Sequence, residues 1–123
     1  MSQDIVADAL NQIMNAKKAG KDTVIIKKHS RLLRNILDIV KESEHLDYEI
    51  NNKELKIKIK TLNEFKAIKP RYTVNIKRIN HYVRRFLPAK NFGFVIISTN
   101  QGLLKHYEAE EKNLGGCLIA YIF

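Results

Sequence analysis

Residues 98–105 read Ser-Thr-Asn-Gln-Gly-Leu-Leu-Lys (STNQGLLK), a polar turn that follows the apolar run FGFVII of residues 92–97. A short, continuous apolar run bounded by turn residues is typical of a buried strand. Gly102 permits a tight reversal, because glycine adopts backbone conformations that are closed to other residues. We therefore expect a strand over residues 92–98, a turn over 99–102 and a returning strand over 103–105.

The segments on either side of this hairpin complete a mostly β lobe. Downstream, a short helix is expected over residues 107–112, and the apolar run CLIAYIF at the end of the chain closes the sheet. Upstream, residues 67–76 hold Pro70, which limits strand pairing and indicates an edge or a bend. Residues 79–87 have the apolar spacing of a helix, which ends before the next proline.

The first part of the chain alternates helices with strands. Residues 4–19 carry apolar side chains at three- and four-residue spacing, which predicts an amphipathic helix. Residues 23–27 (TVIIK) are rich in β-branched side chains and predict a short strand. Ser30 is then placed to cap a second helix.

A hairpin ends this first part. Strands are expected over residues 46–50 and 54–60, with Asn51-Asn52 as the turn between them. Apolar and basic residues alternate over 54–60, so the hairpin should have one buried and one basic face. The acid-poor region begins just beyond residues 61–63. The sequence therefore predicts an α+β fold of two small lobes: an N-terminal α-β-α-β-β domain, residues 1–62, and a C-terminal mostly β domain with short helices, residues 63–123.

The charge distribution points to a polyanionic partner. The chain has 22 Lys and Arg against 13 Asp and Glu, a net charge of +9. From Phe65 through Tyr107 the chain has Lys and Arg residues but no Asp or Glu. A second concentration of basic residues runs from Lys17 to Arg34, where Asp22 is the only acid. A solvated basic surface kept for solubility is the alternative, but so long a window without an acid favours polyanion binding.

Nothing in the sequence argues for catalysis. The four histidines are scattered, and none forms a metal-ligand pair with Cys117 or a carboxylate at useful spacing. Nucleotide-binding loops and nucleophile motifs are missing. Cys117 lies in an apolar run and is interpreted as a small core residue of an intracellular protein. We expect no enzyme, no metal, no cofactor, no small-molecule substrate and no membrane span, since no apolar run approaches the ~20 residues required.

Residues 90–97 (KNFGFVII) echo the RNA-recognition-motif signature [KR]-G-[FY]-[GA]-F-V-x-[FY], which is carried by proteins that bind single-stranded RNA. Asn91 replaces the glycine, and Ile97 replaces the last aromatic residue, whose ring would stack on a base. A buried core strand fits these residues better. Single-strand RNA binding remains as the alternative function.

The polar turn offers short donors and acceptors at four consecutive positions: Ser98, Thr99, Asn100 and Gln101. Phosphate contacts require only positive charge, whereas recognition of RNA shape requires groups that reach sugar hydroxyls and base edges. The same residue types are common in ordinary hairpin loops. Spacing alone leaves both interpretations open.

A resemblance to a known family favours RNA recognition. The C-terminal run STNQGLLKHYEAEEKNLGGCLIAYIF resembles the signature of the small-subunit ribosomal protein S-eight family, roughly S-T-[ST]-x-G-[VI]-[ML]-[ST]-x-x-E-A-x-x-x-x-[LIV]-G-G-x-[LI]-[LI]-x-[YF]-[VIF]. Residues 4–16 (DIVADALNQIMNA) are similar to the family's opening D-x-[IL]-A-[DN]-x-L-x-x-I-x-N. Residues 68–74 (IKPRYTV) and 87–99 (LPAKNFGFVIIST) are similar to its archaeal and eukaryotic branch.

The resemblance implies a two-domain α+β protein of the small ribosomal subunit, in the cytoplasm. It implies that the protein binds helical RNA of the central domain of the small-subunit ribosomal RNA, supports assembly, and has neighbouring small-subunit ribosomal proteins as partners. Both domains of the family bind RNA. The RNA-binding candidates that follow are Ser98, Thr99, Asn100, Gln101 and Gly102 in the C-terminal domain and Asn15, Lys28, Ser30 and Arg31 in the N-terminal one. Lys56 and Lys58 are further candidates, for phosphate contacts.

Three features depart from the family pattern. Asn100 stands where Ser or Thr is expected, and its longer side chain changes the geometry of that contact. Lys105 replaces a small hydroxyl residue that usually caps the following helix. Residues 43–54 (SEHLDYEINNKE) are shorter than the corresponding hairpin of the family, which removes peripheral contacts.

Overall fold

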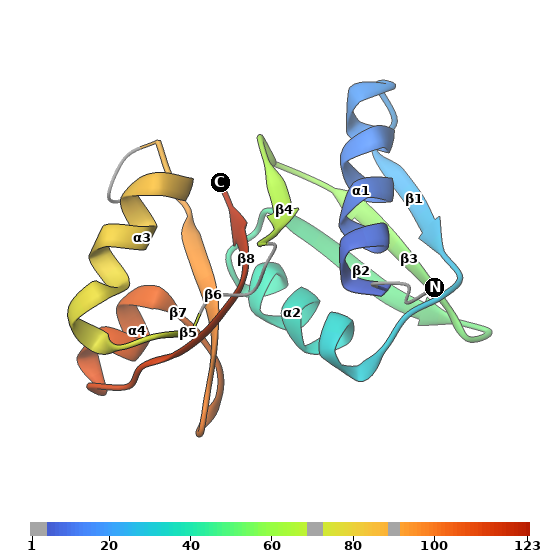
Figure 1. Cartoon of the computed structure of the whole chain (residues 1–123). Coiled ribbons are helices and arrows are strands. Elements are labelled where there is room, and N and C mark those ends of the chain that lie inside the picture. The colour runs from blue at the N-terminus through green and yellow to red at the C-terminus, as the bar shows by residue number, and fades with distance from the viewer. Residues whose placement is uncertain (1–4, 69–72, 89–91) are drawn as a thin grey trace. The chain divides into compact units, whose positions relative to one another are not determined.

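A computed structural model describes residues 5–68, 73–88 and 92–123 of the chain. Parts of three sequence predictions lie outside these residues: the first position of the N-terminal helix, the bend at Pro70, and Lys90 and Asn91 of the recognition-motif comparison. The chain divides into two compact units, Met1–Phe65 and Lys66–Phe123 (Figure 1). The assignment of residues 1–62 and 63–123 as RNA-binding domains stays a prediction.

The first unit contains two helices and a three-stranded antiparallel sheet (Figure 1). Its elements are α1 (Ile5–Lys18), β1 (Thr23–Ile26), α2 (Arg31–Glu42), β2 (Leu46–Asn51) and β3 (Glu54–Ile59). The strand order is β1-β3-β2, so the last strand of the unit is the central one. The predicted α-β-α-β-β order is confirmed.

Both helices have the ends that their sequences predict. In α1, Lys17 and Lys18 occupy the last turn, where positive charge interacts favourably with the helix dipole. The Oγ atom of Ser30 caps α2 by accepting a hydrogen bond from the amide of Leu33 at 3.2 Å. The segment around Ser30 is therefore fixed to the start of a helix.

The β2–β3 hairpin has the predicted alternation but a different turn. Every second residue of β3 from Leu55 to Ile59 is buried, and Lys56 and Lys58 are exposed. Asn51 pairs with Glu54 within the ladder, so the turn consists of residues 52 and 53, whose φ angles are 50° and 69°. The prediction of an Asn51-Asn52 turn was wrong by one residue. Positive φ at both positions gives a turn whose twist matches that of the strands.

The second unit is built on a sheet of five short strands (Figure 1). Its elements are β4 (Phe65–Ala67), β5 (Thr73–Val74), a 3-10 helix (Ile76–Arg78), α3 (Ile79–Phe86), β6 (Phe94–Thr99), β7 (Gly102–Lys105), α4 (His106–Glu111) and β8 (Gly116–Ile122). The strand order is β4-β8-β6-β7, and β5 also pairs with β8. The mostly β lobe with short helices is thus confirmed. None of the helices in the described ranges is long and apolar enough to cross a membrane.

The core of the second unit lies between this sheet and the helices. Residues 94–97 of β6 are all buried, which confirms the predicted buried strand. Val95 and Ile97 pack in one cluster with Ile79 and Val83 of α3 and with Ala109 of α4. The polar turn that follows β6 is therefore attached to the most buried strand of the unit.

His106 connects α4 to β6. The ring is 5% exposed, and its Nδ1 atom accepts a hydrogen bond from the amide of Val95 at 3.1 Å. A ring that accepts at Nδ1 is neutral and carries its proton on Nε2. Burial lowers the pKa of His106, because a charged imidazolium would be poorly solvated there.

His106 predicts a pH dependence of stability. Because the pKa of His106 in the folded protein lies below the ordinary value of 6.5, the unfolded chain binds the proton first as the pH falls. The contribution to the free energy of unfolding is present above pH 6.5 and is lost below it, through the folded-state pKa, with a slope of at most about 1.4 kcal/mol per pH unit. Urea unfolding at a series of pH values measures this loss.

The variant His106→Gln separates this effect from other titrations. Glutamine does not titrate, and its side-chain oxygen can accept a hydrogen bond from an amide. We expect His106→Gln to lack this part of the pH dependence, whereas His81→Gln, at an exposed site, retains it. The same pH dependence in His106→Gln and the parent would contradict the role of His106.

Candidate nucleic-acid interface

The polar turn between β6 and β7 is held by the side chain of Thr99. Thr99 and Gly102 are paired in the ladder, which leaves Asn100 and Gln101 as the two residues of the turn. The Thr99 Oγ1 atom donates a hydrogen bond to the Gly102 carbonyl at 2.8 Å and accepts one from the Gln101 amide at 3.1 Å. The turn is thus internally braced before any partner binds.

These bonds determine which turn residues can donate hydrogen bonds to a partner. The only hydroxyl proton of Thr99 is engaged with Gly102, so toward a partner Thr99 can only accept. Asn100 and Gln101 are exposed, and their side-chain amides can both donate and accept. Gly102 has a φ angle of 102°, which glycine adopts readily, and there is open space where a Cβ atom would lie. The glycine is therefore needed for its backbone conformation and not for close packing.

Ser98 is positioned by a glycine of the neighbouring strand. Ser98 is half-buried and pairs with Cys117 on β8 and with Leu103 on β7. A Cβ atom at Gly116 would overlap the carbonyl group of Ser98. The absence of that atom lets β8 approach β6 at the point where the polar turn begins.

Lys105 ends β7 and lies against aromatic rings. Its Nζ atom is 5.0 Å from the centre of the Phe94 ring and 5.8 Å from that of Tyr107, distances at which a cation is attracted to a ring face. Lys105 makes no side-chain hydrogen bond that caps α4, because an ammonium group has no lone pair. The carboxylate of Glu108 instead accepts a hydrogen bond from the Lys105 amide at 3.1 Å.

In the first unit, the loop between β1 and α2 is tied to the β2–β3 turn. Arg34 Nη1 lies 3.1 Å from His29 Nδ1, and His29 Nε2 lies 2.8 Å from the Lys53 carbonyl. Because a guanidinium only donates, His29 accepts at Nδ1 and donates from Nε2. The sequence analysis considered His29 only as a metal ligand or catalytic residue and missed this link. The link fixes a loop in which Lys28 is exposed and which leads to the exposed Arg31 at the start of α2.

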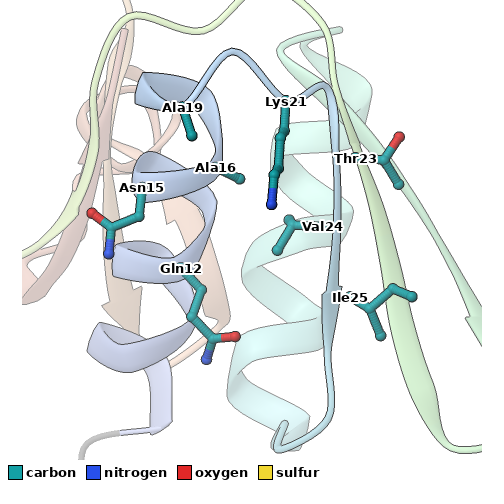
Figure 2. Close-up of a pocket in the computed structure, with 8 residues that line it drawn as sticks. All are labelled: Gln12, Asn15, Ala16, Ala19, Lys21, Thr23, Val24 and Ile25. Carbon is teal, nitrogen blue, oxygen red and sulfur yellow. The ribbon is translucent and has the colours of Figure 1, made fainter.

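A hollow of about 510 Å³ lies between α1 and β1 in this unit (Figure 2). Gln12 and Asn15 contribute from α1, and Lys21 and Thr23 from the other side. Figure 2 shows the Lys21 side chain extended along the space between the helix and the strand. Lys21 and Gln12 were not among the predicted site residues, although Lys21 belongs to the basic concentration seen in the sequence.

A second hollow brings two predicted residues close together. It is lined by Lys27, Lys28 and one acid, Asp8, and shares Gln12 and Ile25 with the first hollow, which Asn15 lines. Asn15 and Lys28 thus belong to adjoining parts of one groove, here called the α1–β1 groove. Ser30 and Arg31 do not line it; Ser30 uses its Oγ atom as the α2 cap, and Arg31 is the exposed first residue of α2.

The open face of the first sheet is mixed in charge, which corrects the prediction of a basic face. In the ladder Lys56 lies opposite Glu49, and Lys58 lies opposite Asp47. These four residues line one shallow hollow. Sequence alternation indicated which lysines are exposed, but the acids come from β2, whose register the sequence does not specify.

Asp47 also has a partner on α2. Its carboxylate lies 3.2 Å from the ammonium group of Lys41. The hydrogen bond from Lys41, followed by that from the Tyr48 amide, lowers the pKa of Asp47. Asp47 therefore stays ionised and keeps its negative charge beside Lys58.

The family described as ribosomal protein S8 matches residues 4–123, almost the whole chain. The chain belongs to the ribosomal protein S8 family.

Three archaeal relatives, each named small ribosomal subunit protein uS8, are similar over nearly their full length. The protein of Methanococcoides burtonii is 37% identical over 98% of this chain and 97% of its own length. That of Nanoarchaeum equitans is 36% identical over 100% of both chains, and that of Pyrobaculum neutrophilum 36% over 98% and 97%. The resemblance inferred from the sequence motifs is confirmed.

Membership of the ribosomal protein S8 family settles the coarse function. The chain is a structural constituent of the small ribosomal subunit in the cytoplasm and is not an enzyme. Its partners are the RNA and the proteins of that subunit.

The close approach of β8 to Ser98 predicts a large effect of Gly116→Ala. The new methyl group would displace the Ser98 backbone, and we expect a loss of about 3 kcal/mol in the free energy of unfolding, at the upper end of overpacking costs. Gly20→Ala is the control, because it has a positive φ angle of 80° but open space, and should cost only about 1–2 kcal/mol. Chemical denaturation of both variants measures the difference. Equal losses would show that the β8–β6 approach tolerates a side chain.

Proposed function

We propose that this family member binds helical RNA in the central domain of the small-subunit ribosomal RNA and supports assembly of the subunit. The second unit would contact the RNA groove through Ser98, Thr99, Asn100, Gln101 and Gly102. The first unit would contact it through Asn15 and Lys28 of the α1–β1 groove and through the adjoining Ser30 and Arg31. Neighbouring ribosomal proteins of the small subunit complete the site of assembly.

The braced turn carries this proposal. The two hydrogen bonds of Thr99 hold the backbone of the turn, while the amides of Asn100 and Gln101 remain exposed. A wide and shallow RNA groove displays 2′-hydroxyls and base edges, which short polar groups can reach. Because the turn is already ordered, little conformational entropy is lost when it binds.

The structure disfavours binding of single-stranded RNA on β6. A stacking platform requires exposed aromatic rings. Phe94 is 3% exposed, and Ile97, at the position where the signature has an aromatic residue, is fully buried, so that Phe92, 47% exposed, is left as a single ring rather than a platform. We expect duplex RNA to compete for the protein more effectively than unpaired RNA of the same composition, and the reverse order would favour the single-strand alternative.

The variant Asn100→Ala tests the turn directly. It removes an exposed amide, so we expect the fold to be intact and binding to small-subunit ribosomal RNA to weaken by roughly 1–3 kcal/mol. Asn63→Ala, another exposed asparagine outside the proposed surfaces, is the matched control and should bind as the parent does. Filter binding at fixed salt measures both, and footprinting on the full-length RNA locates the contact. Parent-like binding by Asn100→Ala would remove the turn from the interface.

Thr99 allows a test of the brace itself. Thr99→Val keeps the shape but removes the hydroxyl, and loss of two hydrogen bonds should destabilise the turn by about 1–2 kcal/mol and weaken RNA binding. Thr99→Ser retains the hydroxyl and should restore both properties. Calorimetric unfolding and RNA binding of the two variants provide the comparison. Identical behaviour of the valine and serine variants would contradict the role given to the Thr99 hydroxyl.

The two pairs of lysines in the first unit should differ in their salt dependence. Lys27→Gln/Lys28→Gln removes two charges beside the α1–β1 groove, and each lost phosphate contact should lower the salt slope of RNA binding by about 0.7–0.9. Lys56→Gln/Lys58→Gln removes the same charge, but Glu49 and Asp47 lie opposite these lysines, so we expect a smaller change. Titrations at several salt concentrations give the slopes. A larger change in salt slope for Lys56→Gln/Lys58→Gln than for Lys27→Gln/Lys28→Gln would show that the open face of the sheet contacts phosphates.

A further inference from the structure

The second unit carries a cationic surface that the proposed contacts do not use. Its charges are those of Lys77 and Arg78 in the 3-10 helix and of Arg84 and Arg85 on α3, and His81 lies between these two pairs; all five residues are exposed. These five residues, here called the α3 cationic face, recur at three- and four-residue spacing and so lie along one side of the helical segment. Figure 1 shows α3 beside β6 in the second unit.

The opposite side of α3 is anchored in the core. Ile79 is fully buried and Val83 is 3% exposed, and both belong to the core cluster of the unit. Tyr82 and Phe86 are partly buried and pack against the same cluster. The cationic side chains are therefore presented by a helix that is fixed to the sheet.

Carboxylates do not neutralise this face. Within residues 5–68, 73–88 and 92–123, the one ion pair present joins Lys41 to Asp47 in the other unit. The acids of α4, which packs against α3, make no ion pair with the α3 cations in these ranges, and one of them, Glu108, accepts from the Lys105 amide. The positive charge of the face is available to a partner.

Helix stability does not account for these residues. Arg84 and Arg85 in the last turn of α3 interact favourably with the helix dipole, but Lys77 and Arg78 precede the helix, where positive charge is unfavourable. The first turn of α3 has no acid, and the cap at the start of the preceding 3-10 helix is neutral: the side chain of Asn75 accepts a hydrogen bond from the Arg78 amide at 3.2 Å. The cations at the start of the helix thus oppose its stability, which indicates that they serve a contact.

The chemistry of the face fits a phosphate backbone. Arginine forks bind phosphate oxygens in a bidentate manner, and two turns of helix place the pairs 77/78 and 84/85 about 10 Å apart, enough to contact more than one phosphate. A protein partner would require an apolar centre. The exposed large apolar side chains of the described residues are Ile25, Ile50, Phe92 and Tyr107, and none of these lies on the face.

We propose that the α3 cationic face binds the phosphate backbone of small-subunit ribosomal RNA and gives the second unit a contact beyond the polar turn. This inference rests on the proposed RNA binding of the chain. It adds an electrostatic contact that does not read bases, whereas the turn reads groove shape. A test must therefore report the two surfaces separately.

Directed hydroxyl-radical cleavage reports each surface by position. In full-length protein with Cys117→Ser, iron-EDTA is tethered to a cysteine introduced as His81→Cys on the face, Asn100→Cys in the turn, or Glu111→Cys on the acidic α4. In complexes with small-subunit ribosomal RNA, we expect strand cleavage from positions 81 and 100 and little from 111. Cleavage from position 100 without cleavage from 81 overturns the α3 proposal and leaves the proposed function standing. Absence of cleavage from both positions overturns both.

Salt titration provides the quantitative test. Arg84→Gln/Arg85→Gln should lower the salt slope of RNA binding by about one to two units and the affinity more than tenfold near 0.1 M salt. Lys41→Gln/Lys112→Gln is the control, because it removes the same charge at two exposed helix ends beside acids. We expect parent-like binding from the control, and circular dichroism should show both double variants folded. An unchanged slope in the arginine variant overturns the proposal and leaves the face to an acidic protein partner.

Discussion

The second unit depends on the close pairing of β6 with β8. β6 is buried along residues 94–97 and delivers the polar turn at its end, while β8 is hydrogen-bonded on both sides. At Gly116 the two backbones are too close for any side chain on β8. Because protein cores are packed as densely as crystals, a strand held in this way has little freedom to shift. The position of Ser98 and Thr99 is therefore set by the core, and the turn only needs to brace itself locally.

In the first unit, polar contacts fix the position of the candidate residues. Its loop between β1 and α2 is held by the Ser30 cap and by the bridge from Arg34 through His29 to the Lys53 carbonyl. Each of these bonds contributes only about 1 kcal/mol net, but together they join the loop to both a helix and a hairpin. Exposed cations next to the loop are thereby placed without being buried, which keeps them solvated and charged.

The sequence predicted those parts of the fold whose signal is local. Amphipathic spacing placed α1, α2 and α3, the Ser30 cap was read directly, and the apolar run of β6 indicated a buried strand. Features that depend on pairing were not predictable. The register of β2 brings Glu49 and Asp47 opposite the lysines of β3, and the hairpin turn falls one residue later than expected. The pairing between β6 and β8 shifts register between Ile96 and Ile97 of β6. Both strands include continuous apolar runs, and such runs contain no alternation that could indicate the shift.

The residues of the candidate site follow the same division. Motif similarity identified the turn residues, but the use of the Thr99 proton on the Gly102 carbonyl comes from the backbone geometry of the hairpin. Net charge indicated a polyanionic partner, yet the distribution of that charge becomes visible only in the fold: the lysines of β3 lie opposite acids, and the cations around α3 form no ion pair in the described ranges. Unpaired cations of one sign repel one another and destabilise the free protein, and at the start of α3 they also oppose the helix dipole. Binding to a polyanion relieves this repulsion. The same positive charges that destabilise the free unit therefore favour its binding to RNA.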